Sequence, residues 1–469
     1  MRRKGLELNV MRRLLMTAAA IVVGTSGVAA AADMTPKANK AEPSIWERDT
    51  LTGDWGGART ALKNQGIDIT LNYIGEAFGV LSGGIDQGAN YEGRFEFSVD
   101  TDLQKLIGWT GGTTHFTIYQ INNSGGTLGD RVGSIDDPSN IDALATTRLF
   151  TAWFEQSFGD RVSVRIGQLA ADDEFVISPT AAGLINGTFG WDSLMSANIT
   201  NGGPAYPLAT PGIRVKVNAT DNLTALGAVF SGNPAGNDCF DEPQACDRYG
   251  TRFSLAGGAL LIGELQYKVN QGKNAPGLPG IYKLGAWYAT ADYPDQHFGI
   301  DSTGAVVSLG VDPTADPVQH KGDWGIYGVA DQMVWRGHDR SMNLFVRGGL
   351  APPDRNLVSY YVDGGAGITG LLPGRANDVL TFGVAYVKIS KDAIAADEDA
   401  LAVNGPPSFI RDEEVVFELS YAAQVAPWWT VQPDLQYIVH PGGNVADPND
   451  PASTIQNAFI AGIRSTMKF

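Results

Sequence analysis

Residues 91–100 read YEGRFEFSVD, and this stretch decides the fold class. Side chains of two kinds alternate along it: Tyr91, Gly93, Phe95, Phe97 and Val99 are apolar or small, whereas Glu92, Arg94, Glu96, Ser98 and Asp100 are polar. Successive side chains of a β-strand point to opposite faces of its sheet. The stretch therefore predicts a strand with one apolar face and one polar face.

The same period of two recurs along the chain, whereas helical periodicity is almost absent after residue 67. Residues 213–218 set Ile213, Val215 and Val217 against Arg214, Lys216 and Asn218. Residues 264–269 and 429–440 alternate in the same way, with Leu265 and Tyr267 opposing Glu264 and Gln266. The chain is therefore expected to be all-β.

Two architectures bury one face of such strands, and strand length separates them. In a soluble sandwich the apolar face forms the core, whereas in an outer-membrane barrel it meets lipid and the polar face lines a lumen. The candidate strands run for about 8–11 residues, the length of a tilted transmembrane strand, while sandwich strands have about 5–6. Length therefore favours the barrel.

The connections between the candidate strands are of two kinds. Tight turns are expected at 64–66, 158–160 and 219–222, and long polar loops at 231–250, 291–320 and 388–412. Short turns on one rim and long loops on the other are typical of outer-membrane barrels. Tryptophans near strand ends are candidates for interfacial girdles: Trp109, Trp191, Trp287, Trp324, Trp335, Trp428 and Trp429.

The last residues form an alternating strand that ends in an aromatic side chain. One face carries Phe459, Ala461, Ile463, Met467 and Phe469, and the other carries Arg464, Thr466 and Lys468. A terminal aromatic of this kind is similar to the signal that the barrel-assembly machinery reads. Phe469 is thus the expected contact with that machinery.

The first 32 residues are expected to be a signal peptide. Basic residues precede an apolar run from Leu14 to Val23, and Ala30-Ala31-Ala32 is a cleavage pattern of small residues. Translation could start at Met1 or at Met11. Removing the five bases and one acid of this segment leaves 29 bases and 50 acids, a net charge of −21. Such an acidic chain is not expected to bind nucleic acid, which requires a basic face.

Chain length indicates one barrel at residues 67–469, preceded by an N-terminal segment at 33–66. About 25 residues per strand and connection give about 16 strands, an even number as such barrels require. A short helix is expected at 54–65, with Asp54 as its N-cap and Gly66 at C′. It would either narrow the barrel from within or cover the periplasmic rim.

Several blocks of the chain resemble the carbohydrate-selective porins of the OprB family. They are Leu51–Arg59, Ile166–Leu169 with Asp172–Phe175, Gly337–Arg340 with Phe345–Arg347, and Pro427–Gly443. The last block is the most specific, because its Trp, Pro, Gln and His positions occur together. The resemblance covers nearly the whole mature chain. It implies a 16-stranded outer-membrane channel that passes glucose-like sugars by facilitated diffusion. The apolar strand faces are expected to contact outer-membrane lipid, and the net charge of −21 indicates acidic outer loops that share divalent cations with lipopolysaccharide.

Selective passage of sugars requires hydrogen-bonding groups and an aromatic surface around a narrow lumen. Trp153 is the expected ring platform, on a face opposite Phe150, Ala152 and Phe154. Arg94 and its neighbours Glu92 and Glu96 are the strongest charged candidates, and Asp172 and Asp173 are expected to begin an inward-folded loop. The remaining lumen candidates are Arg165, Arg214, Lys216, Glu264 and Arg347.

Cysteine and histidine usage indicates a channel rather than an enzyme. Cys239 and Cys246, with six residues between them, are expected to form a loop disulfide in an exported protein. The five histidines show no hydrolase motif and no metal-ligand spacing, so neither catalysis nor a metal or cofactor is expected. A general diffusion porin, or one for organic acids or ions, is the alternative function. A homo-oligomer is compatible with either.

Overall fold

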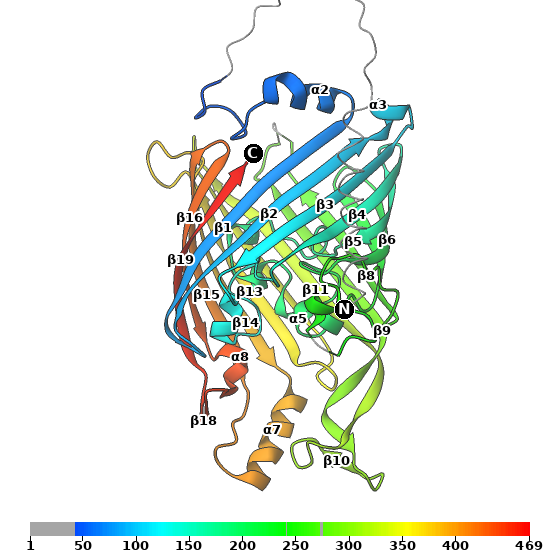
Figure 1. Cartoon of the computed structure of the whole chain (residues 1–469), viewed down its shortest axis with the longest axis vertical. Helices are drawn as coiled ribbons and strands as arrows, with labels where there is room; N and C mark the ends of the chain where they lie inside the picture. Colours follow the sequence, from blue (N-terminus) through cyan, green and yellow to red (C-terminus); the bar gives the residue numbers. More distant parts are fainter. Residues whose placement is uncertain (1–42, 241, 273–274) are drawn as a thin grey trace, which may run out of the picture. The chain divides into compact units, whose positions relative to one another are not determined.

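Residues 91–100 lie in one strand of a closed antiparallel barrel (Figure 1). The computed structural model describes residues 43–240, 242–272 and 275–469. The predicted signal peptide lies outside them. Each barrel strand pairs with the next along the chain, and the last strand pairs with the first, so no edge is left open. The sixteen barrel strands are β1 (Ile67–Gly84), β2 (Gly88–Asp102), β3 (Gly112–Asn123), β4 (Thr146–Phe158), β5 (Val162–Leu169), β6 (Thr210–Asn218), β7 (Leu223–Ser231), β8 (Ala259–Val269), β9 (Gly280–Ile300), β11 (Asp316–Arg336), β12 (Ser341–Leu350), β13 (Val358–Thr369), β14 (Val379–Ile389), β15 (Glu413–Ala426), β16 (Trp429–Val439) and β19 (Gln456–Lys468).

The apolar faces of the strands point outward. On β8, Leu265 and Tyr267 are 52% and 49% exposed, whereas Glu264 and Gln266 are 2% and 9% exposed. β16 likewise has its apolar side chains outside and its polar side chains inside, because Leu435 is exposed and Gln436 is buried. Such a surface is stable in lipid and not in water. The predicted assignment of faces is confirmed at these strands, and the sandwich alternative is wrong.

The two rims differ in the length of their connections. Tight turns, such as those at 159–161 and 219–222, lie on the rim that carries the C-terminus, and long loops lie on the other (Figure 1). The long loops hold α4 (Leu128–Val132), α6 (Pro243–Cys246), β10 (Val306–Ser308), α7 (Lys391–Asn404), α8 (Pro441–Asn444), β17 (Ala446–Asp447) and β18 (Asp450–Thr454). The polarity of the barrel is thus as expected.

The predicted loop at 291–320 is wrong for half of its length. β9 and β11 continue to pair beyond the barrel, with Tyr293 opposite His320, and only 301–315 connects them. Pro294 and Pro317 lie within these paired strands, where register shifts in the β9–β11 pairing accommodate them. Residues 388–412 likewise include a helix, α7, which Ser390 caps by accepting from the Ala393 N–H at 3.2 Å.

The N-terminal helix is shorter than predicted and covers a rim. η1 (Trp55–Gly57) leads into α2 (Ala58–Asn64), whose N-cap is Gly57 rather than Asp54. The Asp54 carboxylate instead accepts from the Thr60 N–H at 2.8 Å, within the first turn. α2 lies at the rim of the short turns (Figure 1), where the Arg59 side chain donates to the Phe469 carbonyl. This agrees with the rim-covering alternative.

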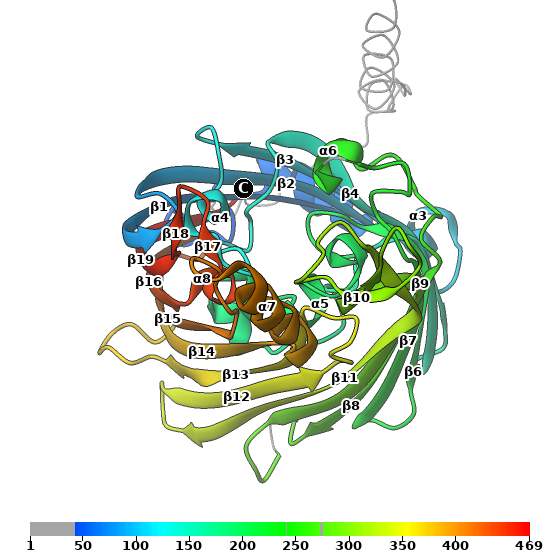
Figure 2. The same ribbon diagram turned by 90° about the horizontal axis from the view of Figure 1, so that it is seen from below.

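The remaining helices are short, and none in the described part of the chain is long and apolar enough to cross a membrane. α3 (Leu103–Ile107) begins at Asp102, whose carboxylate accepts from the N–H groups of Gln104 and Lys105. Four single turns occur together between β5 and β6: η2 (Ala181–Gly183), η3 (Gly187–Phe189), α5 (Ser193–Ser196) and η4 (Thr200–Gly202). They belong to a segment that lies inside the barrel (Figure 2).

Candidate functional site: a narrowed lumen

The segment between β5 and β6, residues 170–209, folds into the barrel and is called here the inner loop. Its irregular backbone would leave donors unpaired in a buried position, and carboxylates of the barrel wall accept from them. Glu264 on β8 accepts from the Val176 N–H at 2.8 Å, and Asp331 on β11 accepts from the Thr180 N–H at 2.8 Å. Glu418 on β15 accepts from the Asn186 N–H at 3.0 Å. Three wall carboxylates thus fix the inner loop across the lumen.

Arg347 on β12 binds the carbonyl side of the inner loop. It is almost fully buried and donates to the carbonyls of Thr188 at 2.8 Å and Gly190 at 2.9 Å, and to that of Val176 at 3.3 Å. Its charge is balanced by the carboxylate of Asp363 on β13, to which its Nε also donates. A guanidinium offers five donors in a fixed plane, which suits a site with this many acceptors.

A second segment, residues 124–145 between β3 and β4, enters the lumen beside the first. Glu92 on β2 accepts from the Leu128 N–H at 2.6 Å, and Glu414 on β15 accepts from the Ile135 N–H at 2.9 Å. Asp136 joins the two segments, because its carboxylate accepts from the hydroxyls of Ser193 and Ser196 in the inner loop. Together the two segments reduce the lumen to a narrow passage.

A cavity of about 500 Å³ lies between these segments and the wall formed by β2, β3 and β4. This volume is within the range of small-molecule sites, about 300–1,000 Å³. Arg94 stacks on one ring of the wall and one of the inner loop, with its guanidinium carbon 4.6 Å from the Tyr119 ring centroid and 4.9 Å from that of Tyr206. Phe150 completes the cluster, 5.1 Å from Tyr119. The Arg94 Nε has no hydrogen-bond partner within the described residues.

The other sides of the cavity carry carboxylates among apolar and neutral polar residues. Asp172 and Asp173, near the start of the inner loop, line the cavity together with Arg94. Burial raises the pKa of Asp172 to about 7 and that of Asp173 to about 6, although the charge of nearby Arg165 lowers the latter. Arg464 on β19, which pairs with β1 next to β2, also lines the cavity and donates to the Asn140 side chain at 2.6 Å. Charged donors and acceptors therefore surround an aromatic surface.

A second stack lies on the same wall. The Trp153 ring is stacked 4.9 Å from the His115 ring, and the Arg165 guanidinium lies 3.8 Å from the Trp153 centroid. Glu155 accepts from both Arg165 and Arg214 at 2.7 Å. The wall therefore repeats the pairing of an arginine with aromatic rings.

The structure separates the predicted lumen residues into four groups. Arg94, Asp172 and Asp173 line the cavity, while Trp153, Arg165 and Arg214 belong to the second stack and its ion pairs. Glu92, Glu264 and Arg347 bind the inserted segments instead. Glu96 accepts from Ser98 at 2.9 Å and from Asn72 at 3.4 Å on the wall of the lumen, and Lys216 is half-buried on the lumen-facing side of β6.

The predicted orientation of Phe150 is wrong, and a β-bulge explains the error. Thr117 pairs with Thr151 and Ile118 with Leu149, so Phe150 is an extra residue in β4. An extra residue reverses the alternation beyond it, and Phe150 points into the lumen instead of toward lipid. Sequence reasoning also missed Tyr119, although it shares a strand face with His115 and Thr117. Tyr206, in the inner loop, and Gln244, on the four-residue helix α6, had no periodic signal.

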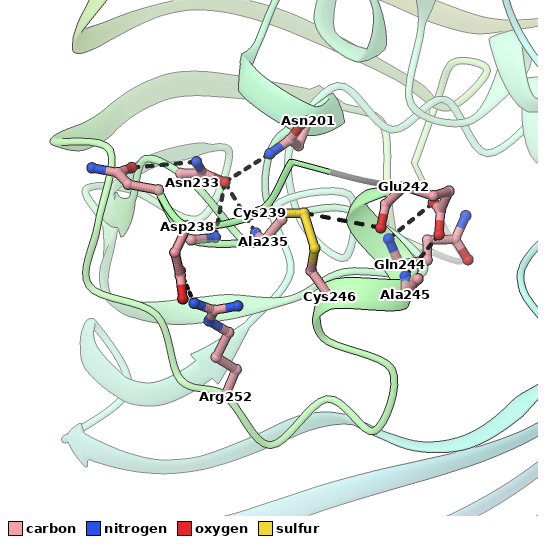
Figure 3. Close-up of a disulfide and its surroundings, with 12 residues drawn as sticks. Asn201, Asn233, Ala235, Asp238, Cys239, Glu242, Gln244, Ala245, Cys246 and Arg252 are labelled. Carbon is pink, nitrogen blue, oxygen red and sulfur yellow. Dashed lines mark hydrogen bonds and ion pairs between the residues drawn. A yellow bond between two sulfur atoms is a disulfide. The ribbon is translucent and has the colours of Figure 1, made fainter.

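Cys239 and Cys246 form a disulfide in the loop between β7 and β8, with their Cα atoms 5.8 Å apart (Figure 3). Among the described residues no group of three or more histidine, cysteine or acidic side chains is placed to hold a metal ion.

A closed barrel with lipid-facing apolar residues and a narrowed polar lumen defines an outer-membrane channel. Residues 86–469 match the family described as carbohydrate-selective porin, OprB family. The chain belongs to this family, and it is an outer-membrane sugar porin.

Two curated relatives extend over nearly the whole chain. Porin B of Pseudomonas aeruginosa is 29% identical over 95% of this chain and 97% of its own length. Putative porin QuiX of Acinetobacter baylyi is 26% identical over 91% of this chain and 94% of its own. Among solved structures, Pseudomonas putida OprB at high pH superposes with a TM-score of 0.78 at 27% identity, covering 91% of this chain and all of that one.

Proposed function

We propose that the cavity beside Arg94 is the sugar-binding constriction of this porin, and that it takes one pyranose ring of a glucose-like sugar at a time. The observation that carries the proposal is Arg94 stacked on Tyr119 and Tyr206, with an unpaired Nε, in a cavity of about 500 Å³. A sugar ring has an apolar face for the aromatic wall and hydroxyls for the guanidinium and carboxylates. Weak, multiple contacts of this kind permit release as well as binding.

The test is the conductance of the purified mature protein in a planar bilayer during sugar titration. Saturable block by glucose and related sugars, without block by organic acids, is the expected result. Arg94→Ala should weaken the block, whereas Arg336→Ala, an exposed arginine at the end of β11, should not. A pore that no sugar blocks would instead indicate a general diffusion porin or one for another solute. Unchanged block in Arg94→Ala would refute the role of Arg94.

Transport without catalysis is part of the same proposal. The channel passes solutes down their gradient, uses no cofactor and performs no hydrolysis. Incubation of the pure protein with labelled oligosaccharides and with lipid esters should release no product, and any turnover would contradict this.

Export and assembly follow from the two ends of the chain. We infer that residues 1–32 are removed after Ala32, which N-terminal sequencing of the membrane-embedded protein would establish. Phe469 is the proposed contact with the barrel-assembly machinery. The outward face of the barrel would contact lipid, and its acidic outer loops would share divalent cations with lipopolysaccharide. Light scattering in detergent would distinguish a monomer from the proposed homo-oligomer.

A further inference from the structure

The loop between β7 and β8, residues 232–258, lies against the outer end of β4. The Leu149 N–H donates to the Tyr249 carbonyl at 3.0 Å, and buried Arg148 donates to the Asp247 carbonyl at 2.6 Å. Gly250 makes this approach possible, because a Cβ there would lie 1.7 Å from the Leu149 carbonyl oxygen and its φ of +65° is a left-handed conformation that favours glycine. The loop therefore lies directly beside the segment that carries Phe150.

One disulfide and two hydrogen bonds hold α6 within this loop (Figure 3). The Cys239–Cys246 disulfide links the last residue of α6 to the loop segment that precedes the helix. The Glu242 carboxylate accepts from the N–H groups of Gln244 at 2.9 Å and Ala245 at 2.7 Å. A helix of four residues is not stable on its own, so α6 depends on these contacts.

Gln244, on α6, reaches the sugar cavity. It lines the cavity together with Asp142, Phe150 and Tyr206. Its Oε1 accepts from the Leu144 N–H at 2.8 Å. Because a backbone N–H can only donate, the amide oxygen must face Leu144, and the NH₂ group supplies the remaining donors.

We propose that Gln244 is a specificity-determining residue of the channel, whose NH₂ group donates to a sugar hydroxyl at the outer side of the cavity. The Cys239–Cys246 disulfide positions α6 and thereby places Gln244 at the cavity. The aromatic wall and Arg94 offer a ring surface and a cation, and Gln244 adds a neutral donor beside them. The inference rests on the proposed sugar-binding constriction and names one of its selective contacts.

The experiment compares three variants in planar bilayers: Gln244→Ala, Cys239→Ser with Cys246→Ser, and the two combined. Loss of one hydrogen bond should raise the half-blocking glucose concentration roughly five-fold, the equivalent of about 1 kcal/mol. The disulfide variant should shift it in the same direction. The combined variant should have the same half-blocking glucose concentration as Gln244→Ala alone, because the effects of two groups that act through one another do not add. Gln319→Ala, in an exposed part of β11, is the matched control.

The outcomes distinguish failure of the Gln244 role from failure of the proposed sugar-binding constriction. If Arg94→Ala weakens sugar block but Gln244→Ala does not, the constriction stands and the role of Gln244 is overturned. If the disulfide and Gln244 effects add fully, the positioning role of the disulfide is overturned. If wild type shows no sugar block, the proposed function itself fails. Unchanged conductance without sugar, and resistance to unfolding in detergent, would show that each variant retains its barrel.

Discussion

Arg347→Met should release the inner loop and widen the channel. The substitution removes the donors to the carbonyls of Val176, Thr188 and Gly190, and leaves the Asp363 carboxylate buried without its cation. Removing one partner of a buried ion pair costs about 3–5 kcal/mol. If that cost falls on docking of the loop, the released state becomes more populated by roughly two to four powers of ten.

Hydrogen exchange and single-channel recording together measure this effect. Amides of the inner loop, above all those that donate to wall carboxylates, should exchange faster in Arg347→Met, and the channel should conduct more with greater open-channel noise. The double variant Arg347→Met, Asp363→Asn should recover part of the protection, since no unpaired charge remains. Wild-type exchange and conductance in the single variant would refute the reasoning, and would mean that the three carboxylates suffice to hold the loop.

Three other predictions concern charge, the terminus and the disulfide. Acidification from pH 8 to pH 5 should protonate Asp172 and Asp173, whose pKa values burial raises to about 7 and about 6, so the lumen loses negative charge. Reversal potentials under a salt gradient should then show weaker cation preference. Asp172→Asn with Asp173→Asn should reduce that pH response without abolishing it, because burial also raises the pKa of Asp142, in the same cavity, to about 7; an unchanged response would assign it to other groups. Deletion of Phe469 should remove the backbone bond from its N–H to the Leu71 carbonyl at 2.8 Å and lower the yield of folded barrel in cells, which fractionation would show; a normal yield would exclude a role in assembly. Thiol labelling of unreduced protein should find no reactive cysteine, and two reactive thiols would contradict the disulfide.

Strand identity and face were predictable because lipid and lumen impose opposite demands on neighbouring residues. Leu265 and Glu264 adopt the predicted faces for that reason. The bulge at Phe150 could not be predicted, since one inserted residue leaves the local composition unchanged while reversing the pattern. The outward continuation of β9 and β11 was also hidden, because Pro294 and Pro317 indicate a loop in any local reading.

The site was predictable only where it lies on regular strands. Arg94 belongs to an alternating stretch, and Asp172 and Asp173 directly follow one. Tyr206 and Gln244 sit in segments with no period, and their positions depend on contacts with residues far away in sequence. Arg347 and Glu264 were predicted on the correct face, but an inward charge that lines a pore and one that binds an inserted loop have the same sequence pattern.

The wall carboxylates that hold the inner loop set an order for biogenesis. Asn186 and its acceptor Glu418 are separated by 232 residues, and Ile135 and Glu414 by 279. The lumen therefore cannot reach its final width until the C-terminal strands have been made and have joined the sheet. In an unfinished barrel the inserted segments lack these acceptors, so we expect the narrowed lumen to form last, together with closure of the barrel.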